Sequence, residues 1–258
     1  MKSLSLAVVA AVIVVQCVGA AGSRNMSVSE RLLRLDAKKV GGVVVKPGSQ
    51  QGSIAFVNAQ SRVQDADVKK VADQIVKMTR LPIMVVKNAS KMTGEEAKTK
   101  FRANVAIVLI DDGDAPIALI APEEHWAVVN VGKLAKGRDN KELTGEFLAS
   151  RCRKELIRTF THLCAGCSTQ FEGNVLGVSK VEDLDTVQEF IPLDMKYKYL
   201  NFMKGIGVTP ATIASYEHAC KEGWAPAPTN DIQKTVWDKV HALPSDPIKI
   251  KYDPKRDK

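Results

Sequence analysis

The sequence predicts an α+β protein with a mixed β-sheet, a long helix after the last strand and a helical C-terminal extension. Three observations predict this class. Runs rich in β-branched residues alternate with amphipathic helical patterns, the longest helical pattern follows the last such run, and the remaining chain carries mainly helical patterns. Hydrophobic residues make up 45% of the 258 residues and charged residues 26%, which excludes a chain that is disordered throughout.

Residues 1–20 are predicted to be a secretory signal peptide. Lys2 is their only charge, residues 4–15 are apolar apart from one serine, and residues 18–20 are the small residues that a signal peptidase cleaves after. We expect export, and a mature protein that is periplasmic, extracellular or on the cell surface. An uncleaved membrane anchor is the alternative, because residues 3–23 are uncharged. We find no second apolar run long enough to span a bilayer.

The chain is basic, with 37 Lys and Arg against 29 Asp and Glu. Removal of the signal peptide takes away one lysine and no acid, and leaves a net charge of +7. This charge favours an anionic partner, such as an envelope component, a glycoprotein or another anionic polymer. Aromatic residues are only 5% of the chain and do not alternate with arginines, so nucleic acid is a possible partner but not the favoured one.

The first half of the chain predicts strands and two helices. Two strands at 40–45 and 53–58 are expected to form a hairpin around the glycine-rich turn between them. A helix up to residue 79 should follow, capped by Asp65 or Asp67, and then a strand at 82–87. The remaining elements before residue 132 are a short helix capped by Thr93, a buried strand at 104–110 and strands at 115–121 and 126–131.

The longest helical pattern covers residues 142–163. It has an apolar stripe formed by Leu148, Cys152, Leu156, Phe160 and Leu163, and a second stripe formed by Arg151, Glu155, Arg158 and His162. Two short helices at 197–203 and 210–222 and a last helix ending at His241 are expected beyond it. The predicted organisation is therefore a signal peptide (1–20), a polar segment (21–40), an α+β domain (41–192) and a helical extension that packs on it (193–258).

Four cysteines remain after the signal peptide: Cys152, Cys164, Cys167 and Cys220. An even number in an exported chain favours disulfides, and four cysteines allow three pairings. Cys164 and Cys167 can also bind a metal together with His162. A redox pair is the third alternative, although these cysteines come at the end of a helix, where the helix dipole does not lower a thiol pKa. We rank the disulfide first, the metal second and the redox pair third.

The order of elements up to about residue 190 resembles the zincin metalloprotease fold, and within it the archaemetzincin branch. There the long helix carries a His-Glu-x-x-His-x-x-Gly-x-x-His zinc motif, followed by a cysteine and a methionine turn. In this chain only His162 matches, at the second histidine. The other motif positions, and the turn methionine, hold Arg158, Thr159, Ala165, Ser168 and Leu176. The resemblance therefore implies no family-type zinc catalysis and no cofactor, with zinc as the alternative.

A guanidinium at the first histidine position changes the chemistry expected there. Arg158 and His162 lie one helical turn apart, and a guanidinium binds carboxylate, sulfate or phosphate well. We therefore expect an anion-binding site formed by Arg158, His162 and Arg151. The competing interpretation is that Arg151, Glu155 and Arg158 are an ordinary ladder of ion pairs. The function favoured by these observations is the binding of an anionic or protein partner.

An active hydrolase of peptide or glycoprotein is the alternative function, and whether the chain is an enzyme is left open. Asp111 and Asp112 follow the buried strand, and Glu124 and His125 form a second polar cluster. Paired carboxylates can perform acid and base catalysis if the fold brings them together. The catalytic candidates are therefore Asp111, Asp112, Glu124, His125 and His162. A basic binder of polyanions or nucleic acid is the second alternative.

Overall fold

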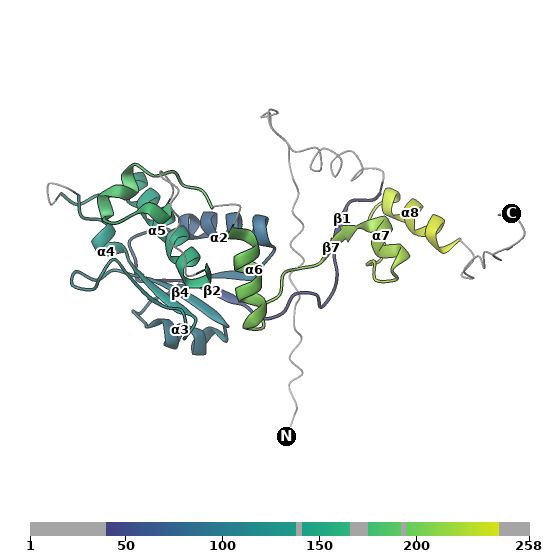
Figure 1. Ribbon diagram of the computed structural model, residues 1–258. Coiled ribbons are helices and arrows are strands. Elements are labelled where there is room, and N and C mark those ends of the chain that lie inside the picture. The colour runs from purple at the N-terminus through teal and green to yellow at the C-terminus, as the bar shows by residue number, and fades with distance from the viewer. Residues whose placement is uncertain (1–39, 138–140, 166–174, 192–194, 243–258) are drawn as a thin grey trace, which may run out of the picture.

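The computed structural model describes residues 40–137, 141–165, 175–191 and 195–242, so the predicted signal peptide lies outside the described residues. A five-stranded mixed sheet forms its centre (Figure 1), which confirms the α+β class. Its strand order is β3-β2-β4-β6-β5, and only β5 runs antiparallel to its neighbour. The strands are β2 (Ile54–Ala59), β3 (Ile83–Asn88), β4 (Val105–Ile110), β5 (Ala118–Ala121) and β6 (Trp126–Asn130).

Helices cover both faces of this sheet (Figure 1). One face packs against α2 (Asp65–Thr79), α5 (Gly145–Ala165) and α6 (Lys196–Gly205), and the other against α3 (Gly94–Phe101). Alternate strand residues point to opposite faces of the sheet. Large side chains such as Phe56 pack on the first face, and smaller residues, mostly alanines, pack on the second. The shorter helical turns are α4 (Val131–Leu134), η1 (Val175–Gly177) and η2 (Val181–Asp185).

Helix α5 is buried on more than one side. Its predicted apolar stripe is buried in the main core, where the Phe160 ring packs edge-on at 6.1 Å from the Phe56 ring and 5.1 Å from the Tyr199 ring. The predicted charged stripe is not a solvent face, because Arg151 and Glu155 are buried as well. None of the described helices is both long and apolar enough to cross a membrane.

Helix caps agree with the sequence at α3 and differ at α2. Thr93 caps α3, and its hydroxyl accepts from the backbone N–H of Glu96 at 3.2 Å. Helix α2 was predicted to be capped by Asp65 or Asp67, which is wrong: Gln64 is its N-cap, and no side chain caps it. Both aspartates lie inside the first turn, where a carboxylate still interacts favourably with the helix dipole.

The predicted hairpin at 40–58 is wrong. β1 (Val43–Val45) leaves the sheet region and pairs antiparallel with β7 (Ile213–Ser215), about 170 residues away in sequence. The predicted helix at 210–222 is correspondingly shorter, because β7 occupies its first part and α7 covers only Tyr216–Lys221. The strand pattern was visible in the sequence, but a partner this distant was not.

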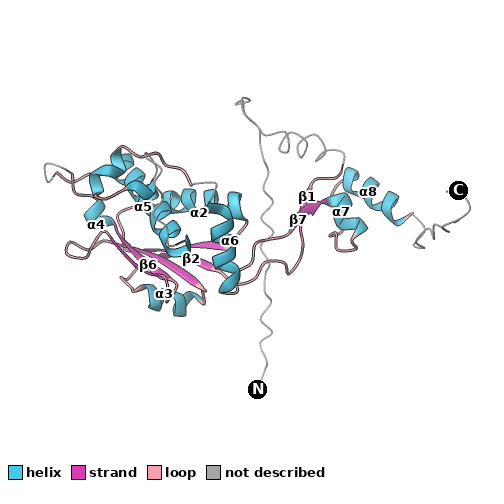
Figure 2. Ribbon diagram, in the orientation of Figure 1, coloured by secondary structure: helices cyan, strands magenta, loops and turns pink. Residues whose placement is uncertain are grey.

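β1, β7, α7 and α8 (Asp231–His241) form a small lobe beside the main domain (Figure 2). Its core consists of Tyr216, Cys220 and Val236, separate from the core around the sheet. Two chain passages connect it to the main domain and are joined by backbone hydrogen bonds, such as Lys46 N–H to Thr212 C=O at 2.8 Å. The predicted C-terminal extension thus contributes α6 to the main domain, and α7 and α8 to the small lobe.

Candidate functional site

Arg151 lies on α5 with every part of its guanidinium in a hydrogen bond. Its Nε and Nη2 donate to the two carboxylate oxygens of Asp185 at 2.7 and 2.6 Å. Its Nη1 donates to the carbonyls of Leu134 and Lys136 at 3.0 and 2.9 Å. The side chain is only 3% exposed, so it ties α5 to α4 and η2 and offers little surface to a ligand.

Glu155, Arg158 and Thr159 form a second polar group on the same helix, which we call the Glu155 cluster. The Glu155 side chain is fully buried and accepts from Arg158 Nε and Nη2, both at 2.8 Å. The Thr159 hydroxyl also donates to Glu155, at 3.2 Å. The Arg158 side chain keeps 20% of its surface exposed, and in the described part of the chain nothing accepts from its Nη1.

His162 follows Arg158 by one helical turn and is half-buried. Burial lowers the pKa of His162, and the nearby positive charge of Arg158 lowers it further. Both effects favour the neutral form of the imidazole. A neutral imidazole can accept one hydrogen bond and donate another, and it can also bind a metal.

The metal alternative needs His162 and Cys164 to face one ligand. Residues two apart on a helix point to nearly opposite sides, and Cys164 is buried in the core. Burial also raises the pKa of the Cys164 thiol well above its ordinary value, which disfavours the thiolate that a metal requires. Among the residues that the structure describes, no three His, Cys, Asp or Glu side chains are placed to hold a metal ion together. Cys167 lies outside these residues.

Among the described residues, Cys152, Cys164 and Cys220 form no disulfide. Cys152 and Cys164 are twelve residues apart on α5, about 18 Å along the helix axis, and Cys220 lies in the core of the small lobe. These positions exclude any disulfide among the three. A role for Cys167 in a disulfide, a metal site or a redox pair stays a prediction.

The candidate carboxylates lie at two ends of the sheet. Asp111 and Asp112 follow the end of β4, whereas Glu124 and His125 precede the start of β6. The register pairs Ala106 with Trp126 and Ile110 with Asn130, so Asp111 and His125 lie six residues apart along the strands, roughly 20 Å. The structure does not bring these two groups into one acid–base pair, and a hydrolase that uses either of them stays a prediction.

Each of these polar groups has a local partner. Arg62 binds Asp111 through Nε and Nη2 at 2.5 and 3.1 Å. The backbone N–H of Asp114 and the ammonium of Lys91 hold the pKa of Asp112 below its ordinary value. At the other end, Trp126 Nε1 donates to Glu124 at 2.5 Å, and the His125 ring packs edge-on against Phe202 with the ring centres 5.7 Å apart.

Arg153 forms three ion pairs, more than any other described residue of α5, and it was not identified from the sequence. Its guanidinium binds Glu189, Asp67 and Glu146 at 2.8, 3.0 and 2.6 Å, and its side chain is 8% exposed. One carboxylate comes from α2, one from α5 and one from the segment after η2. Glu146 lies two turns earlier on the same helix face, which was a visible signal, but the other two partners are distant in sequence.

No protein-family model and no curated protein matches this sequence. Three solved structures are similar to it. The match with an archaemetzincin from Methanopyrus kandleri covers 62% of this chain and 99% of the archaemetzincin, with 14% identity and a TM-score of 0.47. A zinc-dependent peptidase from Methanocorpusculum labreanum (12% identity, TM-score 0.43) and an archaemetzincin from Archaeoglobus fulgidus (14%, 0.39) each cover 57% of this chain and 99% of their own. This similarity concerns backbone arrangement alone and says nothing about the chemistry at α5.

Proposed function

We propose that this protein is exported and acts by binding an anionic or protein partner, not by zinc-dependent peptide hydrolysis. The observation that carries the proposal is the Glu155 cluster on α5. A zinc peptidase needs imidazole or carboxylate ligands and a general base that activates the metal-bound water. At the positions that the resemblance assigns to one ligand and the base, this chain has Arg158 and Thr159, both hydrogen-bonded to Glu155.

The Glu155 cluster leaves one side of the Arg158 guanidinium available to a partner. Glu155 occupies Nε and Nη2, so the donors of Nη1 remain for a carboxylate, sulfate or phosphate oxygen. His162 is the neighbouring side chain one turn further on. Since the buried Glu155 compensates the charge of Arg158, we expect moderate affinity for a single anion. Repeated anions on a polymer or a glycoprotein would strengthen the binding.

The charge and the predicted signal peptide agree with this kind of partner. A net charge of +7 raises the local concentration of anionic polymers around the mature chain. The proposed compartment, outside the cytoplasm, holds acidic glycans and envelope polymers. The partner class that we propose is therefore a carboxylated or sulfated polymer, or a protein that carries one.

The test compares Arg158→Gln with a matched surface variant, Lys77→Gln, which removes the same charge from an exposed position of α2. Affinity for heparin and for polyglutamate is measured by calorimetry at constant ionic strength. We expect Arg158→Gln to weaken binding at least fivefold, and Lys77→Gln to weaken it less than twofold. Equal affinities in the two variants would remove Arg158 from the proposal.

Metal analysis tests the other half of the proposal. The untagged mature protein is dialysed against zinc, and its zinc content and peptidase activity are measured together. We expect no stoichiometric zinc and no zinc-dependent cleavage of a casein substrate. About one zinc per chain with activity that His162→Ala abolishes would overturn the proposal.

A further inference from the structure

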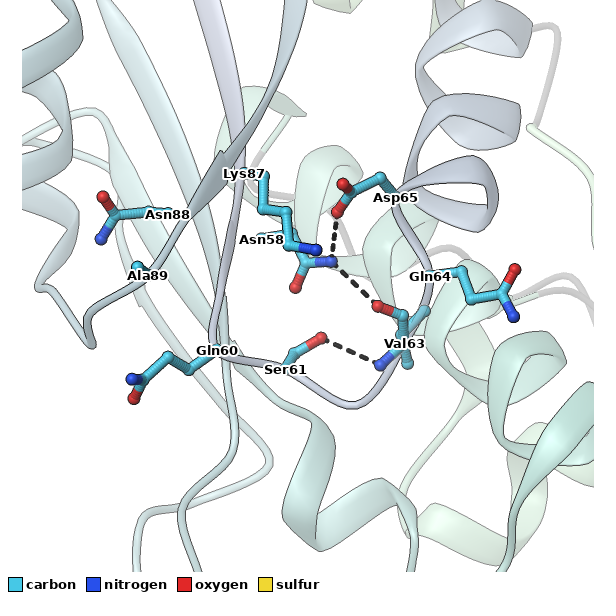
Figure 3. A pocket seen from close by; sticks show the side chains of 9 residues that line it. All are labelled: Asn58, Gln60, Ser61, Val63, Gln64, Asp65, Lys87, Asn88 and Ala89. Atoms are coloured by element: carbon cyan, nitrogen blue, oxygen red, sulfur yellow. Dashed lines mark hydrogen bonds between the residues drawn. The ribbon is translucent and has the colours of Figure 1, made fainter.

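A polar pocket lies where β2 and β3 end and α2 begins, far along the sequence from the charged residues of α5. Its volume is about 360 Å³, within the range of small-molecule sites. We call it the strand-end pocket (Figure 3). It is lined by Asn58, Gln60, Ser61, Val63, Gln64, Asp65, Lys87, Asn88 and Ala89.

The topology of the sheet explains why a pocket lies at the ends of β2 and β3. β2 and β3 are parallel neighbours, but β2 leads into α2 on one face and β3 leads into α3 on the other. Figure 3 shows the two chain connections leaving the strand ends in opposite directions. Adjacent parallel strands whose connections diverge in this way leave a crevice at their carboxyl ends, and this crevice is the usual ligand site of open sheets.

Asn58 gives this crevice an unpartnered polar atom. The residue is 4% exposed, and its amide nitrogen donates to the Val63 carbonyl at 2.9 Å and to the Asp65 carboxylate at 2.6 Å. Because both partners are acceptors, the orientation of the amide is fixed. Its Oδ1 is then buried without a hydrogen-bond partner among the described residues. In Figure 3 it points away from Asp65, toward the part of the pocket that Gln60 and Ser61 line.

Lys87 supplies a donor next to this acceptor. It is the register partner of Asn58 in the β2–β3 ladder, so the two side chains lie on the same face of the sheet. The Lys87 side chain is exposed, and its ammonium bonds to nothing in the described part of the chain. An exposed lysine moves easily, so a ligand can displace it and reach the oxygen of Asn58 beneath.

The other lining groups mix donors and acceptors. The Ser61 hydroxyl accepts from the Val63 N–H at 3.2 Å and keeps its own hydrogen to donate. The side-chain amides of Gln60 and Gln64 each carry both functions. Lys87 and Asp65 are the charged residues among the described lining residues, and none of these lining residues is aromatic.

We propose that the strand-end pocket binds a neutral polyhydroxyl ligand, a monosaccharide or the terminal sugar of a glycan. A hydroxyl group donates and accepts at once, which matches a wall of alternating amides, serine, carboxylate and ammonium. A hydroxyl that donates to Asn58 Oδ1 satisfies its missing bond. A simple anion would lie beside Asp65, a simple cation beside Lys87, and the described lining residues offer an aromatic ligand no ring to stack on.

The test is ligand-detected NMR on the mature full chain with a panel of neutral sugars, including galactose, N-acetylglucosamine, fucose and mannose. Glycine and inorganic phosphate are the charged comparisons. We expect at least one sugar to bind, and neither comparison to compete with it. Equal binding of the methyl glycoside identifies the end of a glycan chain, and loss of binding with the methyl glycoside identifies a free sugar; both results support the pocket. Binding of no sugar at 20 mM, or displacement of the sugar by glycine or phosphate, overturns the proposal.

Variants locate the binding. Asn58→Leu removes the unpartnered oxygen, and Lys87→Met removes the donor beside it from an exposed position, where the fold is not at risk. We expect each to weaken sugar binding at least fivefold, while Lys77→Met on the far part of α2 leaves it unchanged. Arg158→Gln should also leave it unchanged, since this site is independent of the one proposed on α5. Unaltered binding in Lys87→Met would place the sugar elsewhere and overturn the proposal.

Discussion

The charged face of α5 and the strand-end pocket both contain polar and charged side chains, and they differ in how many of these groups are hydrogen-bonded. Along α5, buried Arg151, Arg153 and Glu155 have their hydrogen-bonding groups taken up by partners from the fold. In the pocket, Asn58 lacks one partner and Lys87 has none among the described residues. The comparison teaches that a polar residue marks a binding site by the bonds it lacks, because satisfied polar groups serve mainly stability and specificity.

Arg153→Met should produce the largest effect. The substitution leaves Glu189, Asp67 and Glu146 without their shared cation, two of them little exposed. Breaking such a buried network costs about 3–5 kcal/mol. Urea denaturation at pH 7 measures the free energy of unfolding.

The control for this prediction is Lys69→Met. It breaks an ion pair with Asp73 whose two side chains are 64% and 62% exposed, and such pairs contribute less than about 1 kcal/mol. If both variants lose the same stability, the charges of α5 are not the structural network described here, and the contrast with the pocket fails.

Glu155→Gln should cost less and should also change binding. The amide keeps one acceptor for Arg158 or Thr159 and loses the other, a loss of about 1–3 kcal/mol of stability. It also removes the charge that compensates Arg158, so affinity for heparin should rise. Calorimetry on the variant under the conditions used for Arg158→Gln measures this. An affinity equal to that of the wild type would show that Glu155 does not limit anion binding at Arg158.

Asn58→Leu should cost about 1 kcal/mol or less, although Asn58 is as deeply buried as the residues of α5. The change loses two hydrogen bonds from the amide nitrogen but also removes an oxygen whose burial without a partner costs about 1–3 kcal/mol. Thermal unfolding of the variant and the wild type measures this difference in stability. The same measurement with the sugar added shows how much the sugar stabilises each protein. A loss above 3 kcal/mol would show that the oxygen has a partner in solution and that the pocket is not open to a ligand.

His162→Gln should produce the smallest effect, visible in the pH dependence of stability. The pKa of His162 is lowered by burial and by Arg158, so the unfolded chain binds more protons than the folded chain between the folded pKa and the ordinary value near 6.5. Stability is therefore lost as the pH falls through this window. We expect the variant to lose less stability than the wild type between pH 7 and pH 5, by chemical denaturation at both values. Identical slopes would contradict this placement of the imidazole.

The sequence predicted the elements well where their signal is local. The apolar stripe of α5 repeats every three or four residues, and Thr93 directly precedes its helix, so each could be identified without a partner that is distant in sequence. The hairpin at 40–58 failed because β1 finds its partner at β7, and no local pattern encodes that distance.

A related limit applies to the prediction of individual site residues. Arg151 was expected to bind a ligand because it shares a helix face with Arg158, but Asp185, 34 residues away, occupies its guanidinium. The reverse holds for Asn58, whose unpartnered buried oxygen results from the positions of Val63 and Asp65, which take up the amide nitrogen. Residue types show what chemistry is available, whereas only the packed structure shows which groups are already bonded.

The pairing of β1 with β7 has a consequence for how the chain folds. The small lobe joins two segments separated by the whole of the main domain, and closing such a long loop in the unfolded chain is entropically costly. Once the main domain has folded, the Gln51–Thr209 bridge already holds the two passages side by side. Most of the closure entropy has then been lost, and the lobe needs only a few residues from each end to assemble. The small lobe should therefore fold after the main domain and unfold before it. Its folding depends on an intact main domain, so a folded lobe indicates that the main domain is folded as well.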